Sequence, residues 1–83
     1  MTRTGADTEA LVRYLVESLV DVPEAVEISV TETPEAISFQ ITLDPSDVGK
    51  VIGRGGRIIK AIRTLARAAG STESRQVEVD VVG

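Results

Sequence analysis

The sequence contains no cysteine, no histidine and no tryptophan, and its only aromatic residues are Tyr14 and Phe39. Without cysteine there can be no disulfide framework, no zinc ribbon and no thiol nucleophile. Without histidine as well, the commonest general base is missing, and metal sites other than all-oxygen ones are disfavoured. Two aromatic side chains are too few for a sheet that stacks several nucleic-acid bases on aromatic rings.

Long apolar runs and a surplus of positive charge are absent too. The longest apolar runs span two or three residues, which is too short for a membrane span, and the polar N-terminus has no apolar core like that of a signal peptide. We therefore expect a cytoplasmic protein with no membrane partner. The 83 residues fit a single domain, and 9 basic against 13 acidic residues give a net charge of −4. Taken as a total, that charge speaks against a phosphate-rich partner.

Hydrophobic periodicity predicts an amphipathic helix near the start of the chain. Leucine recurs at every fourth position from Leu11 to Leu19, which places one apolar stripe on a helix over residues 8–20. The preceding residues, 1–7, are expected to form a short polar tail, so that the folded domain spans residues 8–83.

Strict alternation of apolar and polar residues predicts three strands. It occurs over residues 26–32, 37–43 and 76–81, and each strand has one polar face. This pattern favours a single sheet that helices cover on one side only.

The segment between the second and third strands predicts two helices joined by a glycine turn. Asp44 suits the cap of a short helix, Pro45 its first position, and Asp47 its first turn, where a carboxylate faces the positive end of the helix dipole. Glycines within residues 53–56 end this helix, and a second helix follows over residues 57–69.

Charge is segregated along the chain. Residues 48–72 hold six basic residues and no acidic one, a net +6, whereas the rest holds three basic and all 13 acidic residues, a net −10. The six are Lys50, Arg54, Arg57, Lys60, Arg63 and Arg67. On a helical wheel, the basic residues of the second helix lie opposite an apolar side, Leu65 included, that we expect to pack on the sheet. An ordinary solvated helix face mixes both signs of charge, so the single sign favours an anionic ligand.

The glycine turn is suited to a phosphate chain. Glycine permits positive φ and leaves the backbone uncovered, so that a sugar-phosphate chain can approach closely. Gly56 also stands at the N-terminus of the basic helix, where unpaired N–H groups and the helix dipole favour an anion. Two glycines at this spacing often arise by chance. The alternative interpretation is that they only allow the two helices to turn sharply. The P-loop and dinucleotide patterns fit worse, because no Gly-Lys-Ser/Thr closes the turn and a helix, not a strand, precedes it.

The segment from Asp47 to Arg63 resembles the signature of KH domains, in which a GxxG loop links two helices and contacts the nucleic-acid backbone. The element order resembles the type II arrangement, and the length resembles the small stand-alone bacterial KhpA family. The resemblance implies an α+β fold, α-β-β-α-α-β, with a three-stranded sheet covered on one face by three helices. It also implies non-catalytic binding of about four single-stranded RNA nucleotides, without a cofactor or small-molecule substrate. For the KhpA family it further implies a homodimer and/or a heterodimer with a larger KH-containing protein, and a role as a post-transcriptional regulator or RNA chaperone.

The candidate site residues surround the glycine turn. Basic side chains are predicted to contact phosphates, glycines to permit close approach, and isoleucines to line an apolar groove. They are Lys50, Arg54, Arg57, Lys60 and Arg63; Gly53, Gly55 and Gly56; and Ile52, Ile58 and Ile59. Many KH domains have Lys, Arg or Gln in place of Gly55, so we expect Arg54 to supply more of the loop's charge here.

Two other function classes are open to the sequence. A protein-interaction adaptor would use the basic helix face against an acidic partner, and the polar strand faces with Glu27, Glu78 and Asp80, or the sheet edges, for assembly. An adaptor would bind RNA weakly and only at low salt, whatever the length of the RNA. An RNA-binding groove would bind more tightly as the RNA lengthens, until the RNA fills the groove. An enzyme would need carboxylates or lysine, and the best carboxylates, Asp44 and Asp47, are explained by helix capping.

Overall fold

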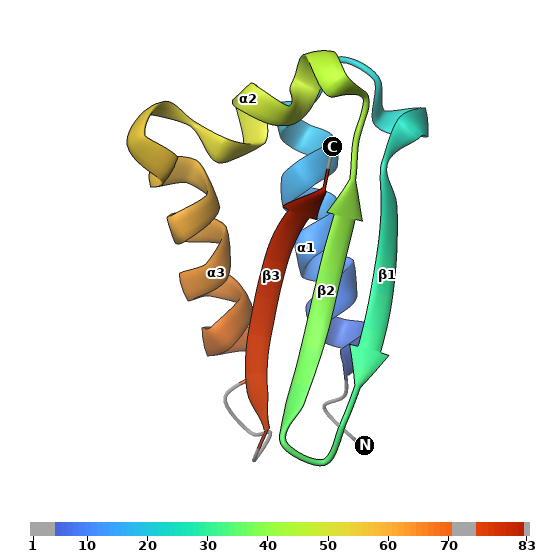
Figure 1. Ribbon diagram of the computed structural model, residues 1–83, viewed down its shortest axis with the longest axis vertical. Helices are drawn as coiled ribbons and strands as arrows, with labels where there is room; N and C mark the ends of the chain where they lie inside the picture. Colours follow the sequence, from blue (N-terminus) through green and yellow to red (C-terminus); the bar gives the residue numbers. More distant parts are fainter. Residues whose placement is uncertain (1–4, 71–74, 83) are drawn as a thin grey trace.

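The computed structural model of the protein describes residues 5–70 and 75–82, and Figure 1 shows how they are arranged. Its helices and strands are, in chain order, α1 (Gly5–Leu19), β1 (Glu27–Glu32), β2 (Ala36–Thr42), α2 (Val48–Ile52), α3 (Arg57–Ala69) and β3 (Gln76–Val82). The predicted α+β fold and its α-β-β-α-α-β order are confirmed. None of the helices in the described ranges has the length and apolar character that crossing a membrane requires.

The three strands form one mixed sheet in the order β1-β2-β3. β1 pairs antiparallel with β2, so that Val30 lies opposite Phe39, and β3 pairs parallel with β2, so that Val79 lies opposite Phe39 on the other side. Parallel neighbours need a crossover connection, and α2 and α3 supply it. The glycine turn therefore sits within the crossover, and β3 forms the edge of the sheet beside α3 (Figure 1).

The helices cover one face of the sheet, as predicted, with α1 running behind the strands (Figure 1). Alternate residues of β2 and β3 point toward the helices and form the centre of the core, while the intervening polar residues lie on the open face. The buried apolar residues are Val12, Val16, Val26, Ile37, Phe39, Ile41, Leu43, Val51, Ile59, Ile62, Ala66, Val77 and Val79. Burial of this set in the shared interior fixes α3 against the edge of the sheet.

Three details differ from the sequence-based predictions. α1 begins at Gly5, so residues 5–7 of the expected tail belong to the helix, and residues 1–4 lie outside the described part. Val30 is on the predicted face of β1 but is 36% exposed, because α3 packs against β3 at the other edge of the sheet and leaves β1 less covered. Leu65 does not pack on the sheet and is 46% exposed, since α3 turns only the Ile59, Ile62 and Ala66 side of its apolar arc inward.

Candidate nucleic-acid interface

The turn between α2 and α3 is built from three glycines with positive φ. The φ angles of Gly53, Gly55 and Gly56 are 77°, 65° and 75°. The Gly53 N–H donates to the Gly49 carbonyl at 2.9 Å and so ends α2, and the Gly56 N–H donates to the Gly53 carbonyl at 3.1 Å. Residues with side chains rarely adopt such angles, so glycine is favoured at each of the three positions.

Gly53 and Gly55 differ in what surrounds them. A Cβ atom at Gly53 would lie 2.6 Å from Cγ1 of Ile58, whereas a Cβ atom at Gly55 would meet nothing within 4 Å. Gly53 therefore allows the loop to pack on the first turn of α3. Gly55 faces open space, so that a ligand backbone can approach the loop there.

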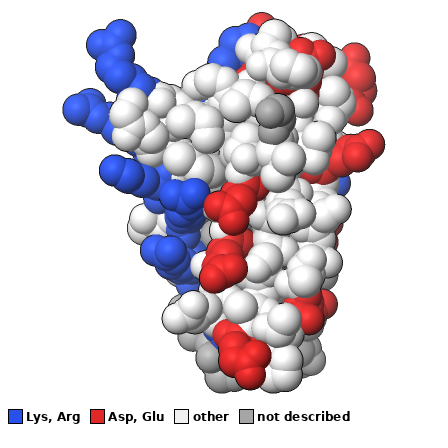
Figure 2. Space-filling model, viewed as in Figure 1, with Lys and Arg blue, Asp and Glu red and all other residues white. Residues whose placement is uncertain are grey.

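The exposed basic side chains form a ridge along the loop and α3. Arg54, Arg57, Lys60 and Arg67 are exposed, and none of these four side chains makes a hydrogen bond or ion pair with another described residue. In Figure 2 the basic side chains gather on one side of the molecule, over the loop and α3, while acidic side chains lie over the sheet and the opposite side. The positive charge predicted from the sequence is therefore concentrated and available to an anion.

Lys50 is placed differently from the prediction. Its Nζ donates to Asp21 and, at 3.1 Å, to Oδ1 of Asp47. Hydrogen bonds from the Lys50 ammonium to Asp21 and then to Asp47 raise its pKa above the ordinary 10.5. Lys50 is thus the counter-ion of two carboxylates of the same chain, whereas the sequence-based prediction placed it on a phosphate.

Asp47 is the buried polar centre of this cluster, and its side chain is fully inaccessible to solvent. The carboxylate accepts hydrogen bonds from the backbone amides of Asp21, at 3.2 Å, and Val22, at 3.0 Å. Burial alone would raise the pKa of Asp47, but these amides and the Lys50 ammonium outweigh it and hold the pKa below the ordinary 3.8. Asp47 therefore ties the segment after α1 to the start of α2. This role was not predicted from the sequence, since no local pattern marks a contact with residues 25 and 26 positions away.

The predicted cap at Asp44 is confirmed. Its Oδ1 accepts hydrogen bonds from the Ser46 hydroxyl at 2.7 Å and from the Ser46 amide at 3.0 Å. These two bonds, the hydroxyl first, lower the pKa of Asp44 below 3.8. The capped turn Pro45–Asp47 leads directly into α2, and it thereby sets the direction in which the chain enters the glycine loop.

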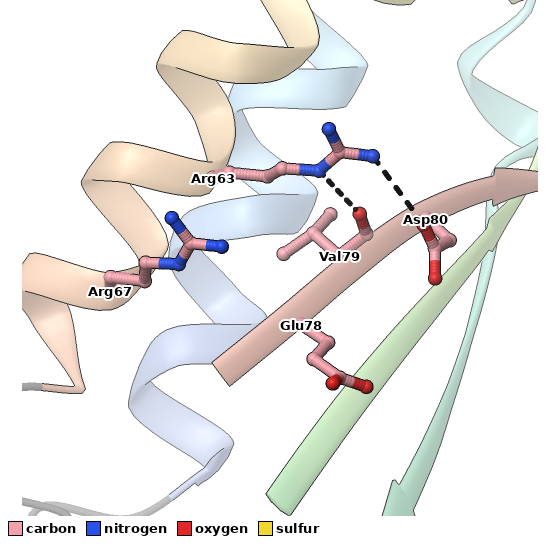
Figure 3. Close-up of a pocket in the computed structure, with 5 residues that line it drawn as sticks. All are labelled: Arg63, Arg67, Glu78, Val79 and Asp80. Carbon is pink, nitrogen blue, oxygen red and sulfur yellow. Dashed lines mark hydrogen bonds and ion pairs between the residues drawn. The ribbon is translucent and has the colours of Figure 1, made fainter. Parts of the chain in front are cut away.

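Arg63 connects α3 to the edge of the sheet. Its Nε donates to the Val79 carbonyl at 2.9 Å, and its Nη2 lies 3.4 Å from Oδ1 of Asp80. Figure 3 shows both contacts in a hollow that also includes Arg67 and Glu78. The hollow has a volume of about 310 Å³. Arg63 therefore lines this hollow, and part of its charge is already paired.

The three predicted isoleucines do not share one surface. Ile59 is 4% exposed and belongs to the core, so the prediction that it lines an open groove is wrong. Ile58 packs over Gly53 and lines a second, largely apolar groove between α1 and α3. Ile52, which is half-buried, packs against the core at the end of α2.

The groove between α1 and α3 has a volume of about 380 Å³. Its lining includes Tyr14, which is 69% exposed, and Leu65, which faces away from the sheet. This groove was not predicted from the sequence, because an apolar helix arc does not reveal which part of it packs inward.

Comparison with known proteins identifies the family. Residues 9–81 match the family described as "KhpA/KhpB, KH domain". The chain is 42% identical over 74 residues to the RNA-binding protein KhpA of Oceanobacillus iheyensis, an alignment that covers 89% of this chain and 99% of the relative. It is 39% identical over 82 residues to the protein of the same name from Borreliella burgdorferi, with 99% of each chain covered.

A solved structure shares the fold. The crystal structure of Era in complex with MgGDPNP and nucleotides 1506–1542 of 16S ribosomal RNA matches 90% of this chain and 30% of that chain, with a TM-score of 0.64 and 22% identity. The family match spans the strands, both helices of the crossover and the glycine loop between them. The chain therefore belongs to the KhpA/KhpB family of KH domains.

Proposed function

We propose that the protein is a non-catalytic RNA-binding protein that holds a short single-stranded RNA segment against its glycine loop. The observation that supports this most directly is the loop itself, in which Gly55 opens to solvent between the exposed cations Arg54 and Arg57. Relatives that match nearly the whole chain are named RNA-binding proteins. The physiological use we propose is post-transcriptional regulation or RNA chaperone activity in the cytoplasm.

The mechanism follows from the chemistry of the loop. A phosphate that approaches Gly55 meets an uncovered backbone, the N-terminus of α3 and two guanidinium groups. The positive end of a helix dipole and arginine side chains both favour phosphate oxygens. Lys60 extends the positive charge along α3, so that successive phosphates can follow the ridge. About four nucleotides offer few phosphate contacts, and we therefore expect modest affinity that depends on salt.

The test is the double substitution R54D/G55D, assayed with a labelled ten-nucleotide single-stranded RNA by fluorescence anisotropy. We expect at least a tenfold loss of affinity, because two carboxylates would face the phosphate path. The control A10D/R13D makes the same change in net charge on α1 and should bind within about twofold of the parent protein. The thermal transition of each variant shows that it is folded. Undiminished RNA binding by folded R54D/G55D would contradict the proposed role of the glycine loop.

The same assay separates an RNA-binding protein from a protein-interaction adaptor. With RNAs of two to ten nucleotides, a groove of fixed size predicts affinity that rises with length and then levels off. Weak binding that does not change with RNA length and that vanishes at moderate salt would favour the adaptor.

We also propose that the chain associates with a second copy of itself through the apolar groove between α1 and α3. Tyr14 and Leu65 expose apolar surface on both sides of the groove. In a two-fold dimer each copy presents the same patch to the other, so exposed side chains of one copy can cover those of its partner. A larger KH-containing protein is the other partner that the family resemblance suggests, and it would use the same surface.

A further inference from the structure

The hollow between α3 and β3 has two walls of opposite charge. Arg63 and Arg67 form the wall on α3, and Glu78 and Asp80 belong to the wall on β3, as Figure 3 shows. If an RNA strand lies here, its phosphates are attracted to α3 and repelled by β3. The strand then has one favourable orientation, with its bases turned toward β3.

Asp80 is the carboxylate of this wall that remains available to a base. Its side chain is 66% exposed, and its contact with Arg63 is 3.4 Å long, well beyond the usual length of a charge-assisted hydrogen bond. Glu78, by contrast, accepts a hydrogen bond from the Ser38 hydroxyl at 2.9 Å on the open face of the sheet. Asp80 can therefore exchange its long contact with Arg63 for shorter ones with a ligand.

Arg63 remains in place during that exchange. Its Nε is bonded to the Val79 carbonyl at 2.9 Å, and this bond is independent of Asp80. The guanidinium group therefore stays beside the carboxylate and compensates its charge while a base binds. This arrangement lowers the electrostatic cost of a carboxylate close to an RNA strand.

The bases differ in what they offer to an ionised carboxylate, which has two acceptor oxygens and no donor. The Watson–Crick edge of guanine presents two adjacent donors, N1–H and an N2–H. Adenine and cytosine present one amino group beside an acceptor nitrogen, and uracil presents one N–H between two carbonyls. An acceptor that faces a carboxylate oxygen is repelled, and such mismatches generate specificity. Guanine alone can satisfy both oxygens at once.

We propose that Asp80 selects guanine at the position of the hollow between α3 and β3, by accepting N1–H and N2–H. This inference rests on the proposed RNA-binding function and extends it from the phosphate chain to one base.

The test compares four ten-nucleotide RNAs, oligouridylate and the same oligonucleotide with a single central guanine, adenine or cytosine, by fluorescence anisotropy at one salt concentration. All four have the same number of phosphates, so differences in affinity report base recognition. We expect the guanine oligonucleotide to bind about tenfold more tightly than the others. In D80N the amide presents one donor and one acceptor, a pair that an edge of each of the four bases can complement, so the guanine preference should be lost. The control E78Q removes the same charge from β3 and should keep the guanine preference.

The outcomes distinguish this inference from the proposed function. Equal and measurable affinity for all four RNAs would overturn the role of Asp80 and leave RNA binding intact. A guanine preference that survives in D80N, or one that E78Q removes equally, would also overturn it. Binding to none of the four RNAs would overturn the proposed function and this inference with it. The thermal transitions of both variants should match that of the parent protein, since both side chains are exposed.

Discussion

At the scale of single residues, the glycines of the loop meet two separate requirements. Gly53 is required by the fold, because its backbone angles (φ 77°, ψ 171°) fall in a region almost restricted to glycine and Ile58 occupies the space of a side chain. Gly55 requires positive φ but has open space around it. The two glycines should therefore respond differently to the same substitution.

We expect G53A to lower the free energy of unfolding by about 3 kcal/mol, from backbone strain and the clash with Ile58. G55A should lower the free energy of unfolding by only about 1 kcal/mol, because it introduces backbone strain without a clash. Gly49 is the matched control, since it lies within α2 and a methyl group there would meet nothing within 4 Å, so G49A should be neutral or stabilising. Urea unfolding of the three variants gives these values. Equal losses for G53A and G55A would contradict the separate roles.

At the scale of elements, α2 is only five residues long and depends on contacts from outside itself. A helix this short is not stable alone in water. Asp44 caps the turn before it, Asp47 bonds the amides of Asp21 and Val22, and Lys50 neutralises the buried carboxylate. Because α2 leads into the glycine loop, the Asp47 cluster fixes the loop's position on the domain.

This cluster predicts a pH dependence of stability. The pKa of Asp47 is lower in the folded protein than the ordinary 3.8, so the unfolded chain binds the proton first as pH falls. The stability that Asp47 contributes is thus fully present above about pH 4 and is lost as pH falls through the folded pKa. We expect D47N to be less stable than the parent protein at pH 7, and the difference in the free energy of unfolding to shrink as pH falls below about 4. Urea unfolding across this range measures it, and a constant difference would contradict the assignment.

The sequence predicted local features well and long-range ones poorly. The bounds of α3, the Asp44 cap and the alternation of the strands follow from propensities and periodicity within a few neighbouring residues. Lys50 was predicted to contact phosphate, and the structure pairs it with Asp21 and Asp47. Asp21 lies 29 positions away and leaves no local signal, whereas Asp47 lies only three positions before Lys50, within the range of a local helical pattern. Ile59 and Leu65 lie on one predicted apolar arc, and only the packing of α3 shows which of them is buried.

At the scale of the whole molecule, basic side chains, acidic side chains and exposed apolar side chains are concentrated in different regions of the surface. The basic ridge follows the loop and α3, acidic residues lie over the sheet (Figure 2), and the apolar groove lies between α1 and α3. The net charge of −4 therefore restricts RNA to the one region where its phosphates are attracted. RNA binding and self-association then use neighbouring surfaces that meet at Arg57, a residue of the basic ridge that also lines the groove.

If the protein self-associates through the apolar groove, a charge placed in that groove should weaken the dimer. L65D places a charge among the exposed apolar side chains, and we expect it to raise the dissociation constant of the dimer at least tenfold, since burying an unpaired carboxylate is costly. T64D is the control, because Thr64 is exposed on α3 outside the groove lining and receives the same charge. Analytical ultracentrifugation over a concentration series measures both. A dimer that persists in L65D, or a parent protein that is monomeric throughout, would contradict this surface.

The parallel pairing of β2 with β3 also affects when the protein can bind. Ala36 pairs with Gln76, a separation of 40 residues, and such non-local pairing forms slowly. During synthesis a ribosome produces the glycine loop and the basic helix before β3. A nascent chain at that stage has the basic side chains of the loop and α3 but lacks the strand against which α3 packs. The base selectivity that we propose for Asp80 therefore requires that β3 has been made and has paired with β2.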